Sequence, residues 1–191
     1  MSEPRRRKTA GFSMIETVFA ISIMLIIAAM AIFNIQGTLP GIYGDAALAS
    51  ARDQMRTARE MAISQRRSVQ VTFPSSNQIQ LHRLDQPAGQ TDFPPVTLSS
   101  RGQFMLFPGL PDAPPSFGNN GPIEFGGQVG GPGMMVFQSD GSFVDFNTGQ
   151  PINGTLFIGL PNNSSSARAL TMLGATGRAR SYRWNGSQWM E

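Results

Sequence analysis

The 191-residue sequence contains no cysteine and only one histidine, and this limits the chemistry it can support. Without cysteine there is no disulfide framework, no thiolate metal site and no cysteine nucleophile. A single histidine, His82, is too little for a zinc site or a Ser-His-Asp triad. His82 is expected to be an exposed strand residue. We therefore expect no enzymatic activity, no catalytic residues, no metal and no cofactor.

Charge is also scarce, and the net charge of +3 is unevenly distributed. Residues 1–11 hold 4 of the 15 basic residues and 1 of the 12 acidic residues, which leaves 11 of each sign in the rest of the chain. A basic segment beside an apolar run orients a protein in a membrane through the positive-inside rule. The high isoelectric point is therefore evidence about targeting rather than about a polyanionic partner.

One long apolar run follows the basic segment. From Val18 to Phe33, only Ser22 interrupts the apolar positions. As a helix, residues 12–35 would span about 36 Å, which is enough to cross a bilayer. A secretory signal cleaved after Ala31 and an ordinary uncleaved anchor are alternative interpretations. The run continues past Ala31 and exceeds the roughly 7–15 apolar residues of a signal sequence, which favours a retained helix.

The junction "RRRKTAGFSMIE" resembles the processing site of type IV pilins and of the pseudopilins of type II secretion. It combines a basic leader, a glycine, an aromatic residue and, four positions later, a glutamate. The resemblance implies that a prepilin peptidase cleaves between Gly11 and Phe12 on the cytoplasmic face and methylates the new amine of Phe12. It also implies a single-pass protein of the inner membrane, with a cytoplasmic leader and a periplasmic C-terminal domain.

Glu16 is the acid within this apolar helix. An ionised carboxylate inside a membrane helix costs roughly 2.5–3.5 kcal/mol on insertion scales, so it is rare without a partner. In a filament of parallel helices, the freed amine of Phe12 on a neighbouring subunit is a suitable partner, and the pair would fix the axial offset between subunits. The alternative is that Glu16 lies near the headgroups and extends its carboxylate to water.

Glycine and proline between residues 37 and 44 predict a break in the helix, and Asp45 is expected to cap a helix that restarts there. The restarted helix has an apolar stripe with helical spacing, to which a sheet is expected to bind: Leu48, Ala51, Met55, Ala58 and Ala62. Its arginines are expected to face solvent. The predicted organisation is a leader (1–11), a transmembrane and assembly helix (12–35), a hinge with an amphipathic helix (36–67) and a β-rich domain (68–191).

The β-rich domain is predicted from alternating apolar residues. Residues 69–73 and 79–81 predict an antiparallel hairpin, with further strands at 104–107 and 123–125. The Gly- and Pro-rich stretch 108–133 predicts a long loop. The remaining strands are expected to form a meander, with a strong turn signal at Asp140-Gly141. A long helix packed on an antiparallel sheet is an α+β architecture.

The order of these segments is similar to the GspH/FimT family of minor pseudopilins and pilins, notably in "MRTAREMAISQRRSVQVTF", "GTLFIGLPNN" and "GATGRAR". The resemblance implies a structural subunit of the type II secretion pseudopilus, with other pseudopilins or pilins, the prepilin peptidase and the inner membrane as partners. The alternative is a FimT-like minor pilin that serves pilus biogenesis and binds DNA during uptake.

The DNA-binding alternative depends on the arginines near the C-terminus. The residues Gly177-Arg178-Ala179-Arg180 match the GRxR pattern of DNA-binding FimT-like pilins, so Arg178, Arg180 and Arg183 are the candidate DNA-binding residues. Strand alternation predicts Arg178, Arg180, Tyr182 and Trp184 on one face, where guanidinium groups hold phosphates and aromatic rings stack on bases. The alternative is that the two aromatic residues seal the core while the arginines lie at its solvated rim.

Overall fold

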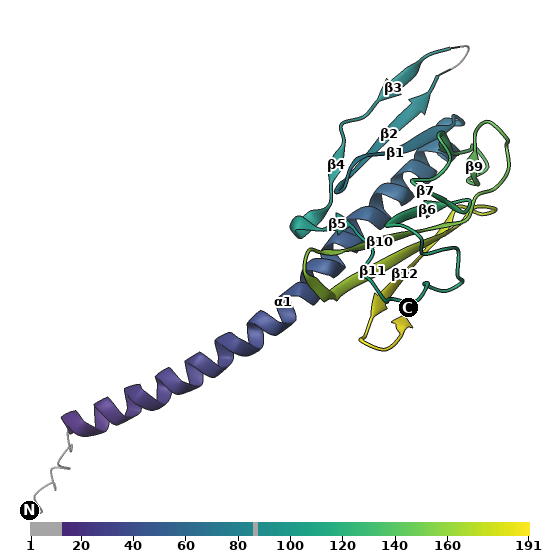
Figure 1. The fold of residues 1–191 in the computed structure, drawn as a ribbon. Helices are drawn as coiled ribbons and strands as arrows, with labels where there is room; N and C mark the ends of the chain where they lie inside the picture. Colours follow the sequence, from purple (N-terminus) through teal and green to yellow (C-terminus); the bar gives the residue numbers. More distant parts are fainter. Residues whose placement is uncertain (1–12, 86–87) are drawn as a thin grey trace, which may run out of the picture. The chain divides into compact units, whose positions relative to one another are not determined.

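The computed structural model describes residues 13–85 and 88–191, and of residues 33–36 only the backbone (Figure 1). The chain divides into two units between Leu39 and Pro40. The first unit contains the N-terminal part of one long helix. The second contains the rest of that helix and all the strands.

The elements form one helix and two antiparallel sheets. The helix α1 comprises Met14–Gln65. The first sheet has the order β3-β2-β1-β8-β9, with β4 also paired to β2: β1 (Val69–Ser75), β2 (Gln78–Leu84), β3 (Gln90–Asp92), β4 (Val96–Thr97), β8 (Met135–Phe137) and β9 (Phe143–Asp145). The second has the order β13-β12-β11-β10-β6-β7, with β5 also paired to β10: β5 (Gln103–Phe104), β6 (Ile123–Phe125), β7 (Gln128–Val129), β10 (Gly154–Leu160), β11 (Asn163–Leu173), β12 (Arg178–Trp184) and β13 (Trp189–Met190). A short 3-10 helix, η1 (Ser99–Arg101), precedes β5.

The helix is continuous, so the predicted break between residues 37 and 44 is wrong. Pro40 lies inside α1, although proline removes one backbone donor. Packing of the following turns against the sheets stabilises the helical conformation there. Gly44 serves this packing, because a Cβ at this position would lie only 2.5 Å from the carbonyl oxygen of Ser166 in β11. The glycine permits close approach of helix and strand rather than ending the helix.

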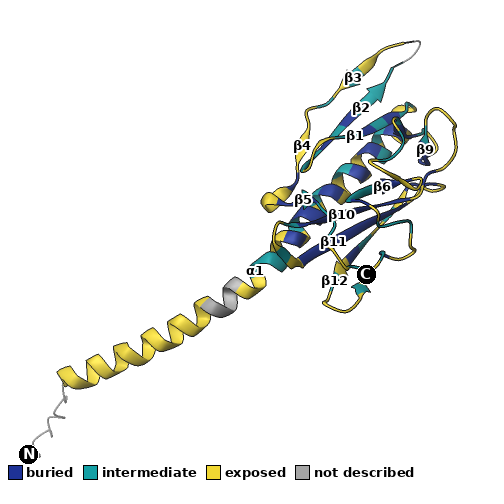
Figure 2. Ribbon diagram, in the orientation of Figure 1, coloured by how far each residue is buried: buried dark blue, intermediate teal, exposed yellow. Residues whose placement is uncertain are grey.

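The predicted apolar stripe of the helix is confirmed. Its five residues, from Leu48 to Ala62, are all buried in the main core (Figure 2). The same core contains Val69, Leu156 and Met172, so it lies between α1 and both sheets. A second, smaller cluster contains Ala113, Phe157, Ala169 and Tyr182. Because β-strand side chains alternate between faces, this cluster marks the face of the second sheet that points away from α1.

The predicted hairpin of residues 69–73 and 79–81 is confirmed, since Val71 pairs with Leu81 in antiparallel register. The predicted meander is confirmed within each sheet, because β8 pairs with β9 and β10 to β13 pair in succession, but it is interrupted between β9 and β10. The strands β8 and β9 join the first sheet through the pairing of Val69 with Phe137, whereas β10 to β13 lie in the second sheet. Alternation along the chain identifies strands, but it does not specify which distant strand is the hydrogen-bonding partner.

His82 is not the exposed strand residue expected from the sequence. Its side chain is only 12% exposed, and its ring nitrogens contact Asp92 at 2.8 Å and the Thr72 hydroxyl at 3.0 Å. The reason is that β3 pairs with β2 and places Asp92 directly opposite His82. The histidine therefore stabilises the pairing of these strands.

Acid is expected to weaken the β2–β3 hairpin through Asp85. Hydrogen bonds from the Thr91 hydroxyl at 2.7 Å and from Arg83 at 2.8 Å lower the pKa of Asp85 below its usual 3.8. The contribution of Asp85 to stability is therefore complete above about pH 4 and is lost as the pH falls through its lower folded-state pKa. Amide hydrogen exchange of the hairpin, measured from pH 5 to pH 2.5, should show less acid sensitivity in Asp85→Asn than in the wild type. The control Asp53→Asn, at an exposed helix position, should follow the wild type; equal acid sensitivity in Asp85→Asn and wild type would contradict the assignment.

Candidate functional site

The described part of the prepilin-like region begins with the first turn of α1. The carbonyl oxygen of Ser13 accepts backbone N–H groups from Glu16 at 3.0 Å and Thr17 at 3.1 Å. Glu16 is exposed and lies in the first turn, where the helix dipole favours a negative charge. Two hydroxyl groups nearby donate to carbonyl oxygens of their own helix, Thr17 to Met14 at 2.7 Å and Ser22 to Val18 at 2.8 Å. They therefore do not require another partner in an apolar environment.

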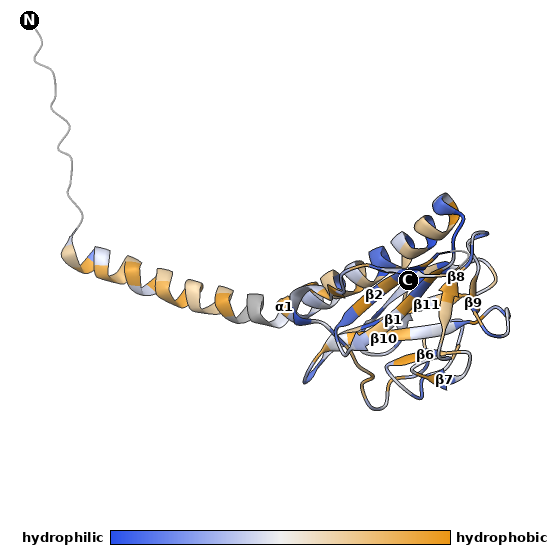
Figure 3. Cartoon of the chain, turned by 90° about the horizontal axis from the view of Figure 1, so that it is seen from above, coloured by the Kyte–Doolittle hydropathy of each residue, from blue (hydrophilic) through white to orange (hydrophobic). Residues whose placement is uncertain are grey.

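Residues 14–32 of α1 are all exposed, although most are large and apolar (Figure 3). Among the described residues, α1 is the one helix that is long and apolar enough to cross a bilayer, as judged by length and composition. Glu16 is the only charged residue in this stretch. An exposed apolar surface of this length requires lipid or partner helices to cover it. The predicted cleavage residues Gly11 and Phe12 lie outside the described residues.

The C-terminal arginines divide between the two faces of β12. Arg178 and Arg180 are exposed and lie opposite Leu173 and Thr171 of β11, on the face that points away from α1. Arg183 lies opposite Arg168 and points to the other face, where a Cβ built at Gly41 of α1 would be 3.9 Å from its Nη2. The structure therefore brings Arg178 and Arg180 together and separates Arg183 from them.

The predicted aromatic partners of these arginines are not available to stack on bases. Tyr182 is 5% exposed and belongs to the smaller core cluster with Phe157. Trp184 is half-buried and packs edge-to-face on Trp189, with 5.3 Å between ring centroids. Tyr182 thus seals the core, as the alternative interpretation of the sequence proposed, whereas Trp184 packs on Trp189. The hydrogen bond between Tyr182 and Arg180, followed by the charge of Glu191, raises the pKa of Arg180 above its ordinary value, so it stays cationic.

The N-terminal segment and α1 can be compared with known proteins. Residues 6–32 match the model of the prokaryotic N-terminal methylation motif. This match confirms the prepilin-type N-terminus indicated by the sequence. The N-terminal segment is followed by a long helix and antiparallel sheets. The chain therefore carries an N-terminal methylation motif ahead of its sheet domain. No curated protein matches its sequence.

The chain is also similar to solved structures of minor pilins and pseudopilins. The minor pseudopilin EpsH from the type II secretion system of Vibrio cholerae matches with 13% identity and a TM-score of 0.46, over 73% of this chain and 96% of EpsH. The type IV minor pilin FimU of Pseudomonas aeruginosa matches in two crystal forms with 14% identity and TM-scores of 0.49 and 0.48. These matches cover 77% of this chain and 92% or 97% of FimU.

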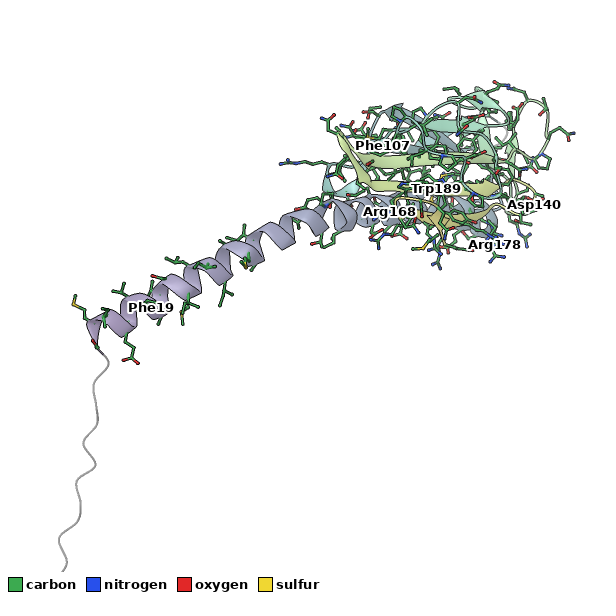
Figure 4. The ribbon with its side chains drawn as sticks, turned by 60° about the horizontal axis from the view of Figure 1, so that its bottom comes forward. Phe19, Phe107, Asp140, Arg168, Arg178 and Trp189 are labelled. Atoms are coloured by element: carbon green, nitrogen blue, oxygen red, sulfur yellow. The ribbon has the colours of Figure 1, made fainter. Side chains whose placement is uncertain are left out.

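Sequence reasoning missed a buried arginine in the sheet domain. Arg168 of β11 is 0% exposed and bonds the carboxylate of Asp45 and the carbonyl oxygen of Gly41, both in α1. Asp45 is therefore an ion-pair partner rather than the predicted helix cap. The signal in the sequence was an arginine inside the apolar run "ARALTML". In Figure 4, the labelled Arg168 and Arg178 lie apart in the sheet domain.

Acidic side chains elsewhere in the described residues are the other features to consider. Within residues 13–85 and 88–191, no group of three or more His, Asp or Glu side chains is placed to hold a metal ion. Glu124 is buried, but Asn120 provides its hydrogen bonds, from the backbone at 2.6 Å and from the side chain at 3.0 Å. The two features that remain are the N-terminal half of α1 with Glu16 and the arginine-bearing edge of β12.

Proposed function

We propose that the chain is a minor pseudopilin, a structural subunit of a type II secretion pseudopilus that is processed by prepilin peptidase. The observation that carries the proposal is the methylation motif over residues 6–32, joined to an exposed apolar stretch of α1, residues 14–32, whose only charge is Glu16. In this proposal the leader is cytoplasmic, the helix is retained in the inner membrane, and the sheet domain is periplasmic. The function of the chain is assembly with other pseudopilins rather than turnover.

Pairing between Glu16 and the amine of Phe12 would specify how subunits assemble. Both groups are expensive to bury alone, because the membrane interior solvates charge poorly. Brought together between neighbouring helices, they neutralise each other, and only one axial offset allows the contact. The apolar residues of 14–32 supply contact area without selecting an offset. Glu16 therefore sets the register, and the apolar surface supplies the packing.

The second candidate is a FimT-like minor pilin that binds DNA during uptake. Its support is that Arg178 and Arg180 are exposed on one face of β12. Two observations weaken it, since Tyr182 is buried in the core and Arg183 lies on the other face. The resemblance of "GTLFIGLPNN" and "GATGRAR" to GspH/FimT proteins is compatible with either filament. The secretion role is preferred because it requires no aromatic stacking surface.

Processing at Gly11 tests the proposal directly. In cells that possess prepilin peptidase, the purified native polypeptide should begin at Phe12 and carry one methyl group on its amine. Intact-mass spectrometry measures both features. The variant Gly11→Val should keep the leader because the side chain obstructs the cleavage site, whereas the control Thr9→Ala should be processed normally. A terminus at Ile32 would instead identify a secretory signal, and an intact Met1 in such cells would overturn the proposal.

A further inference from the structure

One edge of the second sheet is open along part of β12. This strand pairs with β11 from Arg178 to Arg183, but β13 pairs only with Arg183 and Trp184 on the other side. Among the strands of the described residues, none lies beside the outer edge from Arg178 to Tyr182. The N–H and C=O groups that point outward there form a template for an additional strand. The open stretch of five residues is about 16 Å long.

A groove with a volume of about 800 Å³ runs along this edge. It is lined by residues of α1, by β11 and β12 with the turn between them, and by Pro115 and Phe117. A strand with its side chains fits such a space better than a globular surface does, because the groove follows one sheet edge. The groove lies wholly within the unit that begins at Pro40.

The groove carries an excess of positive charge on two of its sides. Its arginines come from α1 and β12: Arg52, Arg56, Arg59, Arg178 and Arg180. Glu60 is the acidic residue in its lining, and its carboxylate is already bonded to Arg56 at 2.7 Å. Arg59 donates to the carbonyl oxygens of Gly141 and Thr176, each at 3.2 Å, which fixes its position.

We propose that this groove binds an extended acidic peptide segment of a partner protein, which adds to β12 as a further strand. Its backbone would pair with the open edge, and its carboxylates, alternating between the two faces, would meet the arginines of α1 on one side and Arg178 and Arg180 on the other. A nucleic acid matches the guanidinium groups but not the edge, because its phosphates cannot donate to the outward carbonyl groups. The inference concerns the sheet domain and does not depend on N-terminal processing.

The test uses the full chain in detergent micelles and fluorescent peptides of about seven residues, roughly 23 Å when extended, in which pairs of adjacent glutamates separated by single valines place carboxylates on both faces of the strand. Fluorescence anisotropy should show saturable binding. Arg178→Gln combined with Arg180→Gln should weaken it about tenfold, and Arg52→Gln should weaken it by a smaller factor. The matched control is Arg101→Gln, because Arg101 is exposed in η1 and does not line the groove; it should bind as the wild type does.

Two N-methylated peptides separate strand addition from simple charge attraction. One is methylated on alternate amides and the other on every amide, and both keep the charge of the parent. Since an added strand uses only alternate amides to pair with β12, the first peptide should keep binding through its free edge and the second should lose binding about tenfold. Equal binding by both, or no saturable binding of the parent peptide, would overturn the proposal. A single-stranded oligonucleotide that displaces the peptide at equal or lower concentration, and that also depends on Arg178 and Arg180, would overturn it in favour of nucleic-acid binding.

Discussion

Replacing Glu16 with valine is expected to leave membrane insertion intact and to abolish co-assembly with partner subunits. Removal of the carboxylate from the apolar helix lowers the insertion cost by roughly 2.5–3.5 kcal/mol, so insertion cannot become weaker. Assembly, in contrast, loses the group that neutralises the neighbouring amine, and an unpaired ammonium group in an apolar environment is strongly disfavoured. Carbonate extraction measures insertion, and cross-linking of each variant to co-expressed pseudopilins measures assembly.

Thr17→Val is the matched control for this experiment. The Thr17 hydroxyl is bonded to Met14 within its own helix, so its removal changes polarity at the adjacent position without changing charge. Thr17→Val should therefore insert and assemble as the wild type does. Cross-linking that survives in Glu16→Val would show that the carboxylate only extends to the headgroup region and that it does not set the register.

A double variant identifies the partner of Glu16. If Glu16 pairs with the amine released at Phe12, blocking cleavage with Gly11→Val removes the same interaction. The combination of Gly11→Val with Glu16→Val should then lose no more assembly than either change alone, because residues of one interaction are not additive. If either single variant retains some cross-linking to pseudopilins and the double variant loses it, Glu16 has another partner.

The parts of the structure that depend on local pattern could be predicted from the sequence. The stripe from Leu48 to Ala62 is buried, the hairpin around Val71 and Leu81 forms, and the turn at Asp140-Gly141 is present, with the Asp140 carboxylate bonded to the Ser142 backbone at 2.8 Å. Each of these features is determined within a few residues, through helical period, strand alternation or turn chemistry. The motif of residues 6–32 is also local.

The features that were not predicted depend on contacts between residues far apart in the sequence. The helix continues through Pro40 because later turns pack closely on the strand of Ser166, which no local propensity reveals. The strand β8 pairs with β1 across more than sixty intervening residues of sequence, from Phe137 back to Val69. The same limitation applies to the candidate site, since alternation placed Arg178 and Arg180 on one face but could not show that Tyr182 on that face is covered.

Replacing Arg168 with alanine is expected to destabilise the sheet domain by about 3 kcal/mol, at the lower end of the roughly 3–5 kcal/mol for breaking a buried ion pair. The guanidinium group is 0% exposed and also donates to the carbonyl oxygens of Ser165 at 3.1 Å, Ala167 at 2.9 Å and Gly41 at 2.7 Å. The lower end applies because the Asp45 side chain is 52% exposed and water solvates its charge when Arg168 is removed. For a domain of this size the loss corresponds to a decrease in Tm of roughly 6–12 °C. Thermal unfolding followed by fluorescence of Trp184 and Trp189, the two tryptophans of the chain, measures it.

The chemistry of Arg168 can be separated from its volume by two further variants. Arg168→Lys keeps the charge and the aliphatic stem, but a single ammonium group cannot reach Asp45, Gly41 and two strand carbonyl groups together, so its Tm should fall between those of wild type and Arg168→Ala. Arg101→Ala removes an exposed arginine and should change stability by less than about 0.5 kcal/mol. If Arg168→Lys matches the wild type, a positive charge alone is sufficient at this position. If it is as unstable as Arg168→Ala, the planar arrangement of donors is what holds α1 to β11, and the ion pair with Asp45 fixes where along the helix the strand binds.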